Sequence, residues 1–240
     1  MPITNAYEDL SQSLRMYLEA HYRAHTDLLF VDRDEAVGNM ELTFTGILNS
    51  FHSLYDAIIK KLGRDILDWY GAPELCIVLA VRNARHHNAA NKIRGLYNYH
   101  IQTSKTPEVH KTYTMVDFVF EHDYINHTDY YLSWDDLSNF LDMGREITRL
   151  RQDSKDLLYR YINANRFYSY AKKRNLNTES LMINFIPLLI NAMRIVTTTI
   201  YDQVVPRTTE GKAFVEIFND RNLFSTKKHT VKYIQVFLPK

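Results

Sequence analysis

Cysteine, glycine and proline are scarce in this chain of 240 residues. Cys76 is the single cysteine, so no disulfide can form within the chain, and a reducing compartment is expected. Seven glycines and six prolines are too few for a turn-rich β-sandwich and far too few for a disordered chain. The first residues show neither the basic nor the apolar segment of a signal peptide, which predicts a cytoplasmic protein.

A strong charge of one sign and a long uninterrupted hydrophobic run are also lacking. The formal net charge is +1, so the whole-chain charge does not indicate a nucleic-acid-binding protein, and RNA contact would need a local patch. The most apolar stretch, residues 181–201, contains Asn184, Pro187, Asn191 and Arg194 within one bilayer thickness. We therefore expect a buried core helix there and no membrane span.

Apolar residues recur at helical spacing along most of the chain, which predicts a mainly α protein. The predicted helices cover residues 7–24, 41–70, 73–99, 134–174 (as one helix or two), 179–203 and 209–220. Only residues 111–123 and 229–238 alternate convincingly with a period of two, and we expect them to pair as a small β ribbon. The expected fold is a single domain over residues 1–240, a helical bundle with a two-stranded β appendage.

A polar block interrupts the third predicted helix. Its first part, the segment ELCIVLAV, is apolar on all sides, as in a helix buried within a bundle. The polar residues that follow are Arg82, Asn83, Arg85, His86, His87, Asn88, Asn91 and Arg94. Asn83 and His87 lie four residues apart and share a helix face, which Asn91 and Arg94 are expected to continue. A helix that changes from buried to polar in this way opens onto water, a partner or a cleft.

The pattern Arg82-Asn83-x-x-x-His87, inside a helix of an all-α domain, resembles the motif of the HEPN superfamily. Many members of that family are metal-independent endoribonucleases of toxin–antitoxin and antiviral defence systems. The resemblance implies a HEPN-like bundle, catalysis by Arg82 and His87 with support from Asn83, and no metal or other cofactor. It also implies a homodimer with two motifs in one cleft, RNA as substrate with tRNA among the candidates, and an antitoxin or defence-system partner.

These residue types suit RNA cleavage. The reaction needs a base for the ribose 2′-hydroxyl, an acid for the leaving 5′-oxygen and a cation for the phosphorane. An imidazole such as that of His87 can take either proton role near neutral pH, and Arg82 can hold phosphate oxygens bidentately. The expected products carry 2′,3′-cyclic phosphate and 5′-hydroxyl ends. The residues expected to contact substrate around this centre are Arg85, His86, Asn91 and Arg94.

Other interpretations of the block remain open. A non-catalytic helical module would use the same patch to hold a protein or nucleotide partner, and a solvated or salt-bridged helix face would need no function at all. His86, four residues after Arg82, would replace His87 if the helix were rotated. Arg94 and His100 form a second, looser spacing that lacks a polar residue after the arginine.

Two histidine-containing segments have metal-ligand residue types. His21 and His25 lie four residues apart on a predicted helix, but two ligands need a third to form a site. The segment FEHDYINHTD contains Glu121, His122, Asp123, His127 and Asp129 in a spacing that matches no metal signature. We interpret the first as part of a surface or interface face and the second as an ordinary polar loop, so no metal site is predicted.

Residues 149–174 interleave basic and aromatic side chains. The basic residues are Arg149, Arg151, Arg160, Arg166, Lys172, Lys173 and Arg174, and the aromatic ones are Tyr159, Tyr161, Phe167, Tyr168 and Tyr170. Such a stretch can follow a phosphate backbone with stacking rings, and the solvated face of an amphipathic helix explains it equally well.

Overall fold

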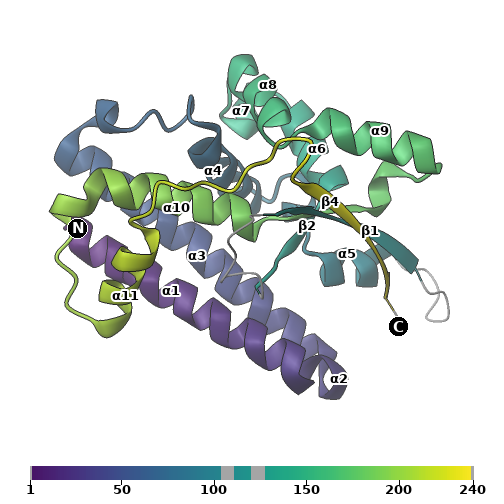
Figure 1. Cartoon of the computed structure of the whole chain (residues 1–240), viewed down its shortest axis with the longest axis horizontal. Coiled ribbons are helices and arrows are strands. Elements are labelled where there is room, and N and C mark those ends of the chain that lie inside the picture. The colour runs from purple at the N-terminus through teal and green to yellow at the C-terminus, as the bar shows by residue number, and fades with distance from the viewer. Residues whose placement is uncertain (1, 104–110, 120–127, 239–240) are drawn as a thin grey trace. The chain divides into compact units, whose positions relative to one another are not determined.

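A computed structural model describes residues 2–103, 111–119 and 128–238 of the chain (Figure 1). The described residues are mostly helical with one small sheet, which confirms the mainly α class. The chain groups into two compact units, residues 1–82 with 190–223 and residues 83–189 with 224–240. That these ranges fold as one HEPN-like domain stays a prediction. None of the described helices has the length and apolar character needed to cross a membrane.

The first unit is built from helices. They are α1 (Ile3–Arg23), α2 (Leu29–Val31), α3 (Arg33–Leu62), the greater part of α4 (Pro73–His86) and of α10 (Ile186–Ile200), and α11 (Thr209–Phe218). Helices α1 and α3 lie side by side (Figure 1). Leu10, Leu14 and Tyr17 recur on one face of α1 and are buried, with Tyr17 packed edge-on against Phe44 of α3.

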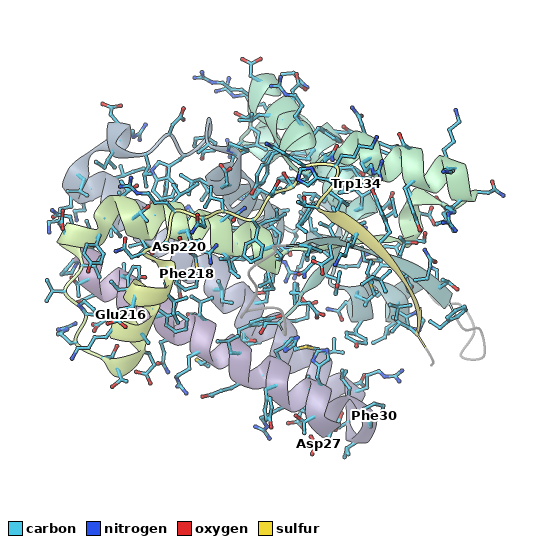
Figure 2. All side chains as sticks on the ribbon, in the orientation of Figure 1. Asp27, Phe30, Trp134, Glu216, Phe218 and Asp220 are labelled. Atoms are coloured by element: carbon cyan, nitrogen blue, oxygen red, sulfur yellow. The ribbon has the colours of Figure 1, made fainter. Side chains whose placement is uncertain are left out.

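The ends of α3 differ from the sequence-based expectation of 41–70. The Asp32 side chain accepts a hydrogen bond from the Glu35 amide at 3.0 Å, so the helix begins eight residues earlier than its apolar pattern indicated. Gly63 ends it with a φ of 90°, a backbone conformation that other residues rarely adopt. Before α3, a short π-helical turn leads into α2, where Phe30 points away from the helices and is 90% exposed (Figure 2).

The second unit contains the sheet and the shorter helices. Its elements are α5 (Leu96–Thr103), β1 (Lys111–Phe118), β2 (Tyr131–Ser133), α6 (Trp134–Asp142), α7 (Arg145–Thr148), α8 (Gln152–Tyr161), α9 (Ala164–Arg174), β3 (Leu181–Asn184) and β4 (Val231–Leu238). The predicted pairing of the two alternating segments is confirmed, because β1 and β4 pair antiparallel along their whole length. The predicted two-stranded appendage is wrong in extent, since the strands belong to a four-stranded sheet of order β2-β3-β1-β4.

Strand β3 lies where the sequence indicated the start of a core helix. Its four residues are all buried and pair parallel with the centre of β1, so the apolar run LMINF serves the sheet before α10 begins. Asn184 ends the strand and its side-chain oxygen accepts a hydrogen bond from the Ile186 amide at 3.1 Å, which starts α10. The helix predicted over 179–203 is therefore wrong in its first part, where the chain forms β3, and α10 covers only Ile186–Ile200. The sequence was ambiguous there because a continuous apolar run fits a buried strand and a buried helix alike.

The helix predicted over 134–174 is four short helices in the structure. Arg149 and Asn163 take left-handed conformations, with φ of 61° and 60°; Arg149 follows the end of α7 and Asn163 precedes the start of α9. The segments pack around Trp134, a fully buried side chain at the start of α6, labelled in Figure 2. Its indole meets Tyr159 and Phe167 edge-on, with ring centroids 5.7 and 5.3 Å away. These ring contacts join residues far apart in the segment, and a single straight helix could not make them.

Candidate functional site

Helix α4 changes from buried to exposed at the polar block. Pro73 occupies its first position, as expected, and residues 75–81 are all buried. The helix ends at His86, and the next residues, His87 and Asn88, are exposed with it. The predicted helix end at Tyr99 is therefore wrong by more than three turns. The polar block forms an open helix terminus, not a polar face along a continuing helix.

Arg82 lies one turn before this terminus and is half-buried. Burial lowers the pKa of its guanidinium, and the carboxylate of Asp56 on α3 opposes that shift. An arginine remains charged at neutral pH despite such a decrease. The residue therefore presents a partly desolvated cation, which interacts more strongly with an anion than a fully hydrated one does.

Asn83 and His87 keep the helical relation that the sequence predicted. The His87 amide donates to the Asn83 carbonyl oxygen at 3.0 Å, so the helical hydrogen-bond pattern extends to His87. Asn83 is 8% exposed, whereas His87 is exposed. The two residues therefore lie one helical turn apart on the same face, the first buried and the second exposed.

His86 and His87 present two imidazoles at the same helix end. Their ring centroids lie 4.9 Å apart with the ring planes at 82°. Both side chains are exposed, so both rings can exchange protons with solvent or with a bound ligand. In the helix, His86 lies four residues after Arg82, and His87 lies four after Asn83.

Arg85 forms hydrogen bonds that stabilise the end of α4. Its Nη2 donates to the Ile93 carbonyl oxygen and to the Tyr130 hydroxyl, both at 3.1 Å, and its guanidinium lies 5.7 Å from the centre of the Tyr130 ring. These contacts join the helix end to the segment that follows it and to the start of β2. Arg85 was predicted to contact substrate, and the structure places its guanidinium in these internal contacts.

Asn91 and Arg94 do not continue the face of α4, because the chain turns sharply after the helix. Left-handed φ values occur at Asn88 and at all four residues from Ala90 to Ile93. The expected continuous face is wrong for this reason. Asn91 and Arg94 instead point to Asp136 on α6.

Asp136 is the centre of a buried polar network. Its side chain is 1% exposed and accepts bonds from Arg94 Nε and Nη2, both at 2.8 Å, and from the Arg94 amide at 3.0 Å. The Asn91 side-chain amide donates to it at 3.1 Å. The Arg94 guanidinium also lies 4.5 Å from the centre of the Tyr99 ring. This network sets the path of the chain after α4 and engages both Asn91 and Arg94, the two other residues predicted to contact substrate.

The structure therefore separates the predicted site residues into two groups. Arg82, Asn83, His86 and His87 gather at the end of α4, while Arg85, Asn91 and Arg94 hold the following segment in place. Arg94 and His100, the second and looser spacing, do not face each other in a shared site. Arg94 binds Asp136, and His100 is buried and hydrogen-bonded to the Tyr113 hydroxyl at 3.2 Å.

The other histidine pair is only partly at the surface, because His25 is exposed whereas His21 is buried at 7% exposure. The rings of His21 and His25 stack with centroids 4.1 Å apart, and the His25 Nδ1 bonds to the His21 carbonyl oxygen at 2.9 Å. In the polar loop, Glu121, His122, Asp123 and His127 lie outside the described residues. The lone cysteine, Cys76, is fully buried, and burial raises the pKa of its thiol to about 12. This is the opposite of what a nucleophilic thiolate requires.

Sequence reasoning missed one polar pair at the sheet. Asp117 is the last residue but one of β1 and Asn184 is the last residue of the parallel strand β3, and the Asn184 side-chain amide donates to the Asp117 carboxylate at 3.1 Å. Asp117 is the one charged residue of TMVDFVF and Asn184 the one polar residue of LMINF, and these interruptions were the available signal. Burial raises the pKa of Asp117, against hydrogen bonds from Asn184 and from the Phe118 amide.

We expect Asp117→Asn to change how stability depends on pH. Because the folded-state pKa of Asp117 is raised, its contribution to stability is fully present below about pH 4, the usual range for an unfolded aspartate, and is lost as pH rises through the folded pKa. The asparagine oxygen still accepts both bonds without titrating. Urea unfolding at several pH values should show the wild type losing stability relative to the variant as pH rises. Two curves that stay parallel would contradict the expected shift.

No known family model, curated protein or solved structure matches the chain. The chemistry of the α4 terminus and the contacts around it are therefore the basis for a functional proposal.

Proposed function

We propose that the chain is a metal-independent endoribonuclease of the HEPN type. The observation that carries the proposal is the end of α4, where two exposed imidazoles follow a half-buried arginine by one helical turn. This combination provides proton transfer and a phosphate-binding cation on one helix. The sheltered position of Asn83 beside His87 supports the same assignment.

The proposed reaction is transesterification within the RNA backbone. One imidazole takes the proton of a ribose 2′-hydroxyl, and the 2′-oxygen forms a bond to the adjacent phosphorus. The bond from phosphorus to the 5′-oxygen breaks, and that oxygen leaves with a proton supplied by an acid. The products are a 2′,3′-cyclic phosphate and a 5′-hydroxyl. His87 transfers a proton in this scheme, and Arg82 binds the phosphorane oxygens.

Two chains complete the proposed site. Base and acid roles require two proton-transferring groups on opposite sides of the phosphorus, and His86 and His87 are held side by side on one helix end. A homodimer that brings two α4 termini together would supply one imidazole from each copy. Such an enzyme fits a toxin or antiviral role controlled by a partner protein, with RNA, including tRNA, as substrate.

The test is incubation of the purified protein with total RNA and with tRNA in the presence of EDTA, followed by analysis of the fragment ends. We expect cleavage that EDTA does not prevent, with cyclic phosphate and 5′-hydroxyl ends. Cleavage that stops with EDTA, or fragments with 5′-phosphates, would contradict the proposed mechanism. Binding of RNA without cleavage at any protein concentration would favour the non-catalytic module instead.

A further inference from the structure

The two units carry opposite charge. Residues 1–82 and 190–223 contain 11 Lys and Arg against 16 Asp and Glu, a net charge of −5. Residues 83–189 and 224–240 contain 18 Lys and Arg against 12 Asp and Glu, a net charge of +6. The overall charge of +1 therefore conceals a strongly basic unit, and such a unit attracts polyanions.

The basic residues of the second unit concentrate along α7 to α9. Residues 145–174 contain nine Lys and Arg against three acidic residues. On α9, Arg166, Tyr170, Lys173 and Arg174 follow each other at helical spacings of four, three and one residues, so they form one stripe. The Arg174 guanidinium lies 5.7 Å from the centre of the Tyr170 ring. The stripe thus alternates cations with a ring.

Strand β4 adjoins this stripe, although it is far away in sequence. The rings of Tyr170 and Tyr233 stack with centroids 3.9 Å apart and planes within 3° of parallel. Arg166 also lies beside Tyr233, where its charge opposes the burial that raises the pKa of that phenol to about 12. Side chains alternate along a strand, so Phe237 lies on the same face of β4 as Tyr233. Phe237 is 68% exposed.

The turn before β4 adds more cations at the start of this surface. The Thr226 hydroxyl donates to the Tyr161 carbonyl oxygen at the end of α8, which fixes the turn beside the beginning of α9. Lys227 and Lys228 follow directly and are exposed. The surface formed by α9, this turn and β4, termed the α9–β4 face, combines cations from two distant segments with an exposed aromatic ring.

We propose that the α9–β4 face binds single-stranded nucleic acid. Lysine and arginine along the face can bind phosphates, and Phe237 offers an uncovered ring on which a base can stack. In a duplex the bases are already stacked on each other, so a ring platform selects the single strand. The proposal concerns binding and stands apart from the cleavage proposal, because its residues lie on different elements from the end of α4.

Fluorescence anisotropy with a labelled 20-nucleotide single strand tests the proposal on the full chain carrying both His86→Ala and His87→Ala, and gel analysis of the strand afterwards checks that it is intact. The four arms are an RNA strand, a DNA strand of the same sequence, the RNA strand paired with its complement, and heparin. We expect the single strands to bind more tightly than the duplex, and a preference for RNA would assign the 2′-hydroxyl a role. Phe237→Ala should weaken single-strand binding by about tenfold, the loss of one stacked base.

The cation part of the proposal is tested by Lys173→Gln with Arg174→Gln. The binding constant falls with salt concentration, and removing two phosphate contacts should make the slope of log K against log salt concentration less steep by about 1.4. The matched control, Lys60→Gln with Lys61→Gln, removes two exposed cations from the end of α3 and should leave the slope unchanged. An equal loss in both double variants, or heparin binding as tightly as RNA with no effect of Phe237→Ala, would overturn the proposal. Thermal unfolding of each variant separates lost binding from lost structure.

Discussion

Replacing His87 by alanine is expected to reduce RNA cleavage by about 10²- to 10⁴-fold, the usual contribution of a positioned acid or base. His87 is exposed at the end of α4 and makes its helical bond through the backbone amide, which alanine keeps. The variant should therefore fold normally and bind RNA while losing proton transfer. Single-turnover cleavage of tRNA measures the change in rate.

His25→Ala is the control, because it removes an exposed imidazole from the first unit without touching α4. It should cleave at the wild-type rate. His86→Ala decides between the adjacent rings: the larger loss identifies the imidazole that transfers the proton. Full activity in both His86→Ala and His87→Ala would refute the proposed site, even if the protein cleaves RNA by other residues.

Asp136→Ala is expected to destabilise the protein by about 3–5 kcal/mol at neutral pH, the range measured when one partner of a buried ion pair is removed. The alanine leaves the guanidinium of Arg94, whose side chain is only 14% exposed, without its carboxylate. It also leaves the Arg94 amide and the Asn91 side chain without their acceptor. Urea unfolding followed by circular dichroism measures the change.

Asp135→Ala, one residue earlier on the same helix, is the matched control. Asp135 is half-buried, and burial and the neighbouring Asp136 charge raise its pKa. Its removal should therefore leave stability nearly unchanged or slightly increased. A double variant with Arg94→Ala and Asp136→Ala should lose less than the sum of the single variants, because each single variant leaves one buried charge unpaired and the double variant leaves none. Simple additivity would mean that the pair does not stabilise the segment after α4.

Local patterns in the sequence were sufficient for several elements. Apolar spacing located α1 and α11, and Pro73 marked the first position of α4. Period-two alternation identified β1 and β4 and their pairing, since only those two segments had that pattern. In the candidate site, the change from ELCIVLAV to a polar block correctly located where α4 becomes exposed, because the burial of a helix is visible in its composition.

Elements that depend on distant partners were not visible in the sequence. The run LMINF is a strand because β1 lies beside it, although the same residues suit a buried helix. The helix predicted over 134–174 breaks at Arg149 and Asn163 to let its pieces pack around Trp134. Local pattern cannot supply such choices, because the energy that decides them comes from contacts between residues far apart in the chain.

The sequence by itself thus determined the helical class, the β1–β4 pair and the position of the polar block around Arg82 and His87. Only the tertiary structure decided that α4 ends at His86 and that Arg94 turns to Asp136, a partner 42 residues away. Only the tertiary structure also placed Tyr233 of β4 against Tyr170 of α9. The physical reason is the same in each case: burying a charge or a ring is favourable only with its partner present, and folding brings that partner from elsewhere in the chain.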